Sequence, residues 1–105
     1  MFYELRRYQI QPGHRDEWVR VMETVIIPFQ TSKGMTVTAS FTDEEDPDAY
    51  FWMRRFEDEA ERVTLYAAAY YNDEWKAIIG EHGHLLLGDQ ITVRRLVPTP
   101  KSPVR

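Results

Sequence analysis

Glu4, Arg6 and Arg54 are the residues of this sequence whose types and spacing best suit chemistry. Glu4 and Arg6 lie two apart in "FYELRRYQI", and Arg54 lies in "YFWMRRF". Both stretches have the composition of β-strands, in which alternate side chains share a face. Arginines hold anionic or carbonyl groups by forked hydrogen bonds, and a carboxyl whose pKa is raised by burial can act as a general base. The group indicates either a ligand site or an ion-pair network that only holds the structure together.

Aromatic side chains accompany these charges. Tyr8 has the same strand parity as Arg6, Trp52 has that of Arg54, and Tyr71 lies in a helical segment further on. Tyr and Trp suit half-wet, enclosed surfaces because each joins a large ring to a polar atom. We therefore expect a pocket for a small aromatic or anionic molecule. Its ligand-binding residues would be Arg6, Tyr8, Trp52, Arg54 and Tyr71, with Glu4 as the candidate catalytic residue.

Other candidate sites carry weaker signals. His82 and His84 follow Glu81 in "GEHGHLLLG", but a zinc site needs a third protein ligand. They are weak metal candidates, and helix-end capping is the simpler interpretation. The acidic stretch "DEEDPD" at 43–48 lacks the length, the central glycine and the distal glutamate of a calcium loop, and predicts a hairpin turn. We expect no metal and no cofactor.

Composition limits the class of protein. The chain has 105 residues, of which 43% are hydrophobic and 29% charged, which is typical of one globular domain. A net charge of −4 gives no basic surface for nucleic acid, and the absence of cysteine excludes disulfides and thiolate chemistry. No apolar run suggests a membrane span, and the first residues are too charged for a signal peptide. These features predict a cytoplasmic protein.

Periodicity predicts four strands and two helical regions. Strands are expected over residues 2–10, 35–42, 50–56 and 90–97. A helical stripe of apolar residues runs from Trp18 to Phe29, with Pro28 expected to kink or stop it. A second helical region starts at Glu57 and should break at Gly80 and Gly83. Residues 1–97 would form the domain, and the proline-rich residues 98–105 a disordered tail.

The order β-α-β-β-α-β predicts an α+β, ferredoxin-like fold. Its antiparallel sheet has the strand order 4-1-3-2, with both helical regions on one face. Strand parity separates two faces. We expect the helices to cover the more apolar face, which comprises Tyr3, Leu5, Val37, Ala39, Phe41, Phe51, Met53, Ile91 and Val93. The other face would carry Glu4, Arg6, Tyr8, Thr36, Thr38, Ser40, Trp52, Arg54, Thr92 and Arg94. A second copy of the chain would enclose it, or it would lie open to solvent.

Three segments resemble the NIPSNAP family. They are "YELRRYQIQPG" at 3–13, "DPDAYFWMRRFEDEAER" at 46–62 and "YYNDEW" at 70–75. The similarity implies a dimeric α/β barrel, in which ferredoxin-like subunits pack sheet to sheet around a cavity. In one bacterial branch a histidine often follows the step W-K-A, where this chain has Ile78.

The resemblance leaves the reaction open. At superfamily level the relatives include cofactor-independent quinol monooxygenases, haem-degrading monooxygenases, chlorite dismutases and muconolactone isomerases, whereas NIPSNAP members mostly have no assigned reaction. Because a fold does not fix a function, three alternatives stand. The homodimer binds a small molecule without turnover, transforms it as a monooxygenase or isomerase, or serves only as a dimerisation scaffold.

Overall fold

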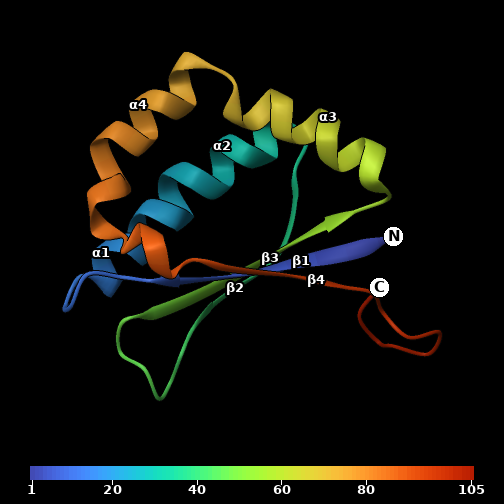
Figure 1. Cartoon of the computed structure of the whole chain (residues 1–105), viewed down its shortest axis with the longest axis horizontal. Helices are drawn as coiled ribbons and strands as arrows, with labels where there is room; N and C mark the ends of the chain where they lie inside the picture. The colour runs from blue at the N-terminus through green and yellow to red at the C-terminus, as the bar shows by residue number, and fades with distance from the viewer.

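A computed structural model describes residues 1–105, and the chain folds as a sheet with helices on one face (Figure 1). The strands are β1 (Phe2–Gln9), β2 (Thr36–Thr42), β3 (Ala49–Phe56) and β4 (Thr92–Leu96). All pairs are antiparallel, in the order β2-β3-β1-β4. The predicted ferredoxin-like topology is confirmed, and β1 and β3 lie side by side at the centre, which brings Glu4 opposite Arg54.

The helical layer consists of two hairpin-like segments above the sheet (Figure 1). The first is continuous through α1 (Arg15–Val21), the π-helical turn η1 (Met22–Ile26) and α2 (Ile27–Ser32). The second comprises α3 (Glu59–Tyr70), α4 (Asp73–His82) and the short 3₁₀ turns η2 (Gly83–Leu85) and η3 (Gly88–Gln90). None of these helices has both the length and the apolar composition that a membrane span needs.

Capping residues explain why the second helical region divides in two. The Asp58 side chain accepts a hydrogen bond from the backbone N–H of Glu61, and Asn72 accepts one from that of Trp75. A side-chain acceptor at this position satisfies a backbone donor that the first helical turn leaves free. Asn72 therefore starts a new helix directly after α3. Contrary to the prediction, α4 continues through Gly80 and ends at His82.

Pro28 does not stop the first helix. The helix continues to Ser32, and the irregularity lies before the proline, in the π-helical turn Met22–Ile26. Proline cannot donate a hydrogen bond to the preceding turn, so a wider turn just ahead of it is a local solution to the same constraint. The turn presents Met22 and Ile26 to the core, where both are buried.

The helices cover the face that carries Trp52 and Arg54, so the predicted assignment of the two faces was wrong. Trp52, Tyr50 and Tyr8 are buried and join a core cluster with Trp18 of α1. Arg54 is 0% exposed. The parity was right for β1 and β3, but the charged residues hid the fact that this face also carries the largest rings.

Two register details account for the rest of the error. A β-bulge between Val37 and Ala39 puts Val37 opposite Arg54 but Ala39 opposite Met53, so these two β2 residues lie on opposite faces. In β4, Val93 lies opposite Arg6, whereas Arg94 lies opposite Leu5. Thr92 and Arg94 are therefore on the open face, contrary to the prediction.

The open face of the sheet is partly apolar, and we call it the open sheet face. It consists of Tyr3, Leu5, Arg7, Ala39, Phe41, Phe51, Met53, Thr92, Arg94 and Leu96. Phe41 is 57% exposed and Leu96 is 41% exposed. Val97, Pro98, Ser102 and Val104 line a shallow hollow beside Tyr3 and Met53. The predicted disorder of residues 98–105 stays a prediction.

Gly34, which ends the first helix as predicted, should be intolerant of a side chain. Its φ of +100° is a left-handed conformation, and an added Cβ would lie 2.9 Å from the Leu65 Cδ2 atom. Because the left-handed region costs a non-glycine residue about 1–2 kcal/mol, we expect Gly34→Ala to lower the free energy of unfolding by about that amount. Urea titration measures it. Gly80→Ala is the control, and it should stabilise α4 by about 1 kcal/mol, since nothing lies within 4 Å of its added Cβ.

Candidate functional site

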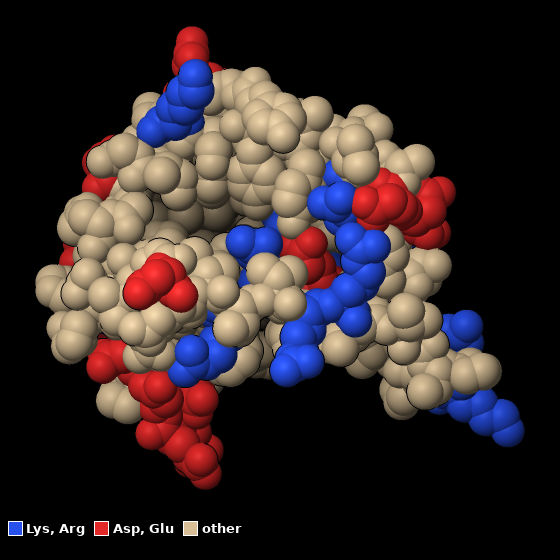
Figure 2. All heavy atoms as spheres, in the orientation of Figure 1, with Lys and Arg blue, Asp and Glu red and all other residues tan.

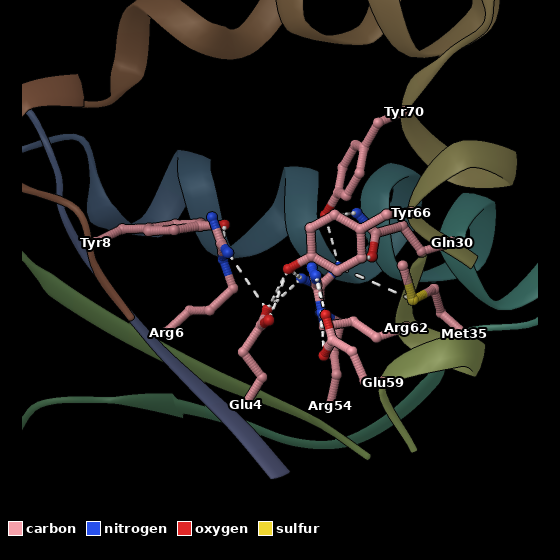
Figure 3. Close-up of polar contacts among 10 residues, drawn as sticks. All are labelled: Glu4, Arg6, Tyr8, Gln30, Met35, Arg54, Glu59, Arg62, Tyr66 and Tyr70. Carbon is pink, nitrogen blue, oxygen red and sulfur yellow. Dashed lines mark hydrogen bonds and ion pairs between the residues drawn. The ribbon is translucent and has the colours of Figure 1, made fainter. Parts of the chain in front are cut away.

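The buried guanidinium of Arg54 is the centre of the site (Figure 3). Its Nη2 donates to Glu4 Oε1 at 2.5 Å and to the Tyr66 hydroxyl at 2.8 Å. Its Nη1 donates to the Tyr70 hydroxyl at 2.5 Å and to Gln30 Oε1 at 2.8 Å. The sheet supplies the two charges, while α2 and α3 supply the neutral partners, so the network joins both layers of the fold.

Aromatic rings surround the same guanidinium. The Arg54 Cζ atom lies 4.7 Å from the centroid of the Trp52 ring and 5.0 Å from that of Tyr66. Arginine is the cation best suited to such a place, because its planar charge stacks on rings and is weakly hydrated. All four Nη hydrogen bonds go to protein groups, so Arg54 is held by the fold and is not free to bind a ligand.

Glu4 is a strongly held carboxylate. It accepts hydrogen bonds from Arg54, from the Tyr66 hydroxyl and, at 3.3 Å, from Arg6 Nη1. Burial alone would raise the pKa of Glu4, but the charge of Arg54 and the hydrogen bond from Tyr66 outweigh it, and the pKa lies below its usual value. The raised pKa that a general base would need is therefore not found. Glu4 is the counter-ion of two arginines.

Arg6 connects this network to a cavity. Its Nε donates to the Tyr8 hydroxyl at 3.0 Å and its Nη1 to Glu4, but its Nη2 donates to no protein group. The side chain is 19% exposed, whereas that of Arg54 is fully buried. In Figure 3, Arg6 and Tyr8 lie on the side of Glu4 away from Arg54. Arg6 is thus the one charged residue of the cluster with a donor still available.

The cavity lies between the sheet and the helices and has a volume of about 150 Å³. Figure 2 shows the hollow below the helical layer, with basic and acidic atoms beside it. Its lining is almost wholly aromatic or aliphatic apart from Arg6, and it comprises Arg6, Tyr8, Trp18, Met22, Ile26, Trp52, Tyr70, Trp75, Ile79, Leu86 and Ile91.

The structure brings together some of the sequence candidates and separates others. Arg6, Tyr8 and Trp52 line the cavity, and Arg54 lies behind it. Tyr71 is 82% exposed and is not part of the wall, and its neighbour Tyr70 takes that place. A helix turns by 100° per residue, so the segment "AAAYY" did not show which tyrosine faces inward.

Several site residues were not found from the sequence. Tyr66, Tyr70 and Gln30 complete the Arg54 network, yet none stands out in the sequence. Tyr66 and Tyr70 lie four apart on α3, the spacing of one helical face, which was an available signal.

The predicted metal candidates do not form a cluster. His82 lies 3.7 Å from Glu81, and no group of three His, Asp or Glu side chains is placed to hold a metal ion. Neither His82 nor His84 lines the cavity.

Comparison with known proteins decides the family. The NIPSNAP family model matches residues 3–103. The chain belongs to the NIPSNAP family. No curated protein matches it. The three segments that carried the resemblance all lie within the matched residues, and the first two contain Glu4, Arg6, Trp52 and Arg54.

Solved NIPSNAP structures have the same fold. Protein Atu4242 from Agrobacterium tumefaciens is 22% identical, with a TM-score of 0.89 and coverage of 100% of both chains. The NIPSNAP family protein Atu5224 from the same organism is also 22% identical, with a TM-score of 0.88 over 99% of this chain and 98% of that one. An antibiotic biosynthesis monooxygenase is similar at a TM-score of 0.67 and 15% identity, over 95% of this chain and 100% of that one. At these identities the likeness shows the fold alone.

Proposed function

We propose that this NIPSNAP protein binds a small molecule in the cavity between its sheet and its helices. The observation that carries the proposal is the lining of the cavity, which is aromatic and aliphatic except for one arginine. Binding sites for small molecules are mostly apolar, with a few placed polar groups that fix orientation. A cavity of about 150 Å³ accepts a molecule with one ring, since an apolar cavity of that size is known to hold benzene.

Binding rather than acid–base turnover at Glu4 is the function that the geometry supports. The lowered pKa of Glu4 makes it a weak base, and its oxygens already accept hydrogen bonds from Arg54, Tyr66 and Arg6. The monooxygenase alternative gains only the fold from its structural neighbour. A haem macrocycle is larger than the cavity, and no histidine lines it.

Tryptophan fluorescence tests the proposal directly. The protein has three tryptophans, Trp18, Trp52 and Trp75, and all of them line the cavity. A bound ring should therefore change the whole emission signal. We expect a saturable change on titration with single-ring compounds such as benzoate or benzamide. The change should be lost in Ile79→Phe, which fills the rim of the cavity. Val63→Phe, on the exposed side of α3, should bind normally.

Two results would count against a binding cavity. One is the absence of any saturable change with either compound at millimolar concentration. The other is equal binding by the Ile79→Phe variant and the unmodified protein, which would place the ligand elsewhere.

We also propose that the chain forms a homodimer through the open sheet face. The NIPSNAP resemblance implies subunits that pack sheet to sheet, and the helices already cover the other face. The open sheet face exposes apolar side chains on both edge strands, Phe41 on β2 and Leu96 on β4. A two-fold dimer would bury this patch against its own copy.

The mass in solution tests the dimer. We expect light scattering to give about twice the chain mass of 12.5 kDa, and Phe51→Asp on the central strand β3 to reduce it to a single chain. An unpaired carboxylate buried in an interface is costly. Val63→Asp is the control, because Val63 is 54% exposed on α3, away from the sheet, and should leave the mass unchanged. A single-chain mass for the unmodified protein would contradict the proposal.

A further inference from the structure

The charged groups beside the cavity do not balance. The network contains two guanidinium groups, Arg6 and Arg54, and one carboxylate, Glu4. Burial raises the pKa of Tyr8, and it raises the pKa of Tyr66 to about 12, so these phenols stay protonated at neutral pH. The partly buried cluster therefore carries a net charge of +1. Buried charge is costly unless it is paired.

The hydrogen-bonding groups of the cavity are unbalanced in the same direction. Trp18 Nε1 and Trp52 Nε1 are buried donors with no acceptor in the protein, and both side chains line the cavity. Arg6 Nη2 is a third donor that no protein group uses. A buried donor left unsatisfied costs about 1–3 kcal/mol, so three such groups around one cavity need an explanation.

The lining offers little in return to a ligand that brings donors. Glu4, the nearest carboxylate, is not in the lining, and its oxygens accept from Arg54, Tyr66 and Arg6. The Tyr8 hydroxyl already accepts from Arg6. A cationic ligand would meet a positive cluster with no free carboxylate. A neutral apolar ligand would fill the space but leave the charge and the indole donors unmatched.

Resting on the proposed binding function, we infer that the ligand is a single-ring organic anion, with a carboxylate, phenolate or enolate oxygen directed to Arg6. Its ring packs among the indole and phenol rings, and its charge completes the group formed by Glu4, Arg6 and Arg54. Arg6 is the residue that sets specificity. Arg54 positions Glu4, and Glu4 in turn positions Arg6.

Three compounds of nearly the same shape test the charge requirement. They are benzoate, benzamide and benzamidine, which at pH 7 carry charges of −1, 0 and +1. We expect fluorescence titration and calorimetry, at one fixed salt concentration, to show benzoate bound at least about 10-fold more tightly than benzamide. Benzamidine should bind more weakly than either.

Substitutions of Arg6 test the assignment of the anchor. Arg6→Met should remove the preference for benzoate while keeping the binding of benzamide, and Arg6→Lys should retain part of the preference. Arg7→Gln is the matched control, because Arg7 is the next residue on β1 but lies on the open sheet face. It should bind all three compounds as the unmodified protein does.

The outcomes separate the two proposals. Equal binding of benzoate and benzamide would overturn the anionic ligand while leaving the binding cavity in place. A preference for benzoate that survives in Arg6→Met would overturn Arg6 as the anchor. If none of the three compounds binds, the binding function fails and the ligand class fails with it.

Discussion

Replacing Arg54 by methionine should lower the free energy of unfolding by about 3–5 kcal/mol, the usual result of removing one partner of a buried ion pair. The substitution leaves the carboxylate of Glu4, which is 4% exposed, without its main counter-ion. It also removes the donor for the side chains of Gln30 and Tyr70. Urea unfolding followed by fluorescence measures the loss as a shift of the midpoint.

A double variant shows how much of that loss comes from the stranded carboxylate. Adding Glu4→Gln to Arg54→Met removes the unpaired charge, so the double variant should be more stable than Arg54→Met alone. Arg62→Met is the control. Arg62 pairs with Glu59, whose side chain is 53% exposed, and such exposed pairs contribute little. A loss as small for Arg54→Met as for Arg62→Met would contradict the central position of Arg54.

Acid should remove the contribution of the same network. The pKa of Glu4 is lower in the folded protein than its ordinary value of 4.5. A group with a depressed folded pKa contributes stability that is fully present above its unfolded pKa and is lost as pH falls through the folded value. We therefore expect the free energy of unfolding to fall below about pH 4.5, the ordinary value for this carboxyl. Protonation of Glu4 would leave two arginines in the interior without an anion.

Glu4→Gln isolates this contribution from that of other carboxyls. The pKa of Glu59 is also lowered, to about 2, by its hydrogen bond with Arg62, and that of Asp43 by backbone hydrogen bonds. The Glu4→Gln variant should be less stable at pH 7 but should lose less stability between pH 7 and pH 3. Urea midpoints at both pH values test this. An equal loss in the variant and the unmodified protein would show that Glu4 does not titrate with folding.

The order of elements could be predicted from the sequence, because strands and helices have distinct periods and strong boundary signals. The strands agree with the prediction to within two residues, as "MTVTASFT" illustrates: its alternation predicted 35–42 and β2 is Thr36–Thr42. The π-helical turn was not predictable, because it depends on how the helix packs around Pro28. The break at Asn72 depends on one cap in a segment of otherwise good helix formers.

The site was predicted in its residues but not in its surroundings. Strand parity correctly grouped Glu4, Arg6, Trp52 and Arg54. The error was to expect that a face with three charges cannot lie under helices. Tyr66, Tyr70 and Gln30 supply the hydrogen bonds that make this burial possible, and they come from segments 12 to 24 residues away from Arg54 along the chain. Such complementarity arises only when the layers pack, and no local pattern reports it.

The wide turn at Met22–Ile26 has a consequence for how the protein tolerates changes in length. Each residue of a regular helix advances the direction of the next side chain by 100°. Deleting one residue here would let the helix become regular, but everything after the deletion would rotate by about that angle relative to α1. Gln30, which accepts the hydrogen bond from Arg54, would then turn away from the sheet. The irregular turn therefore sets the angular phase that brings the helix and the buried arginine together.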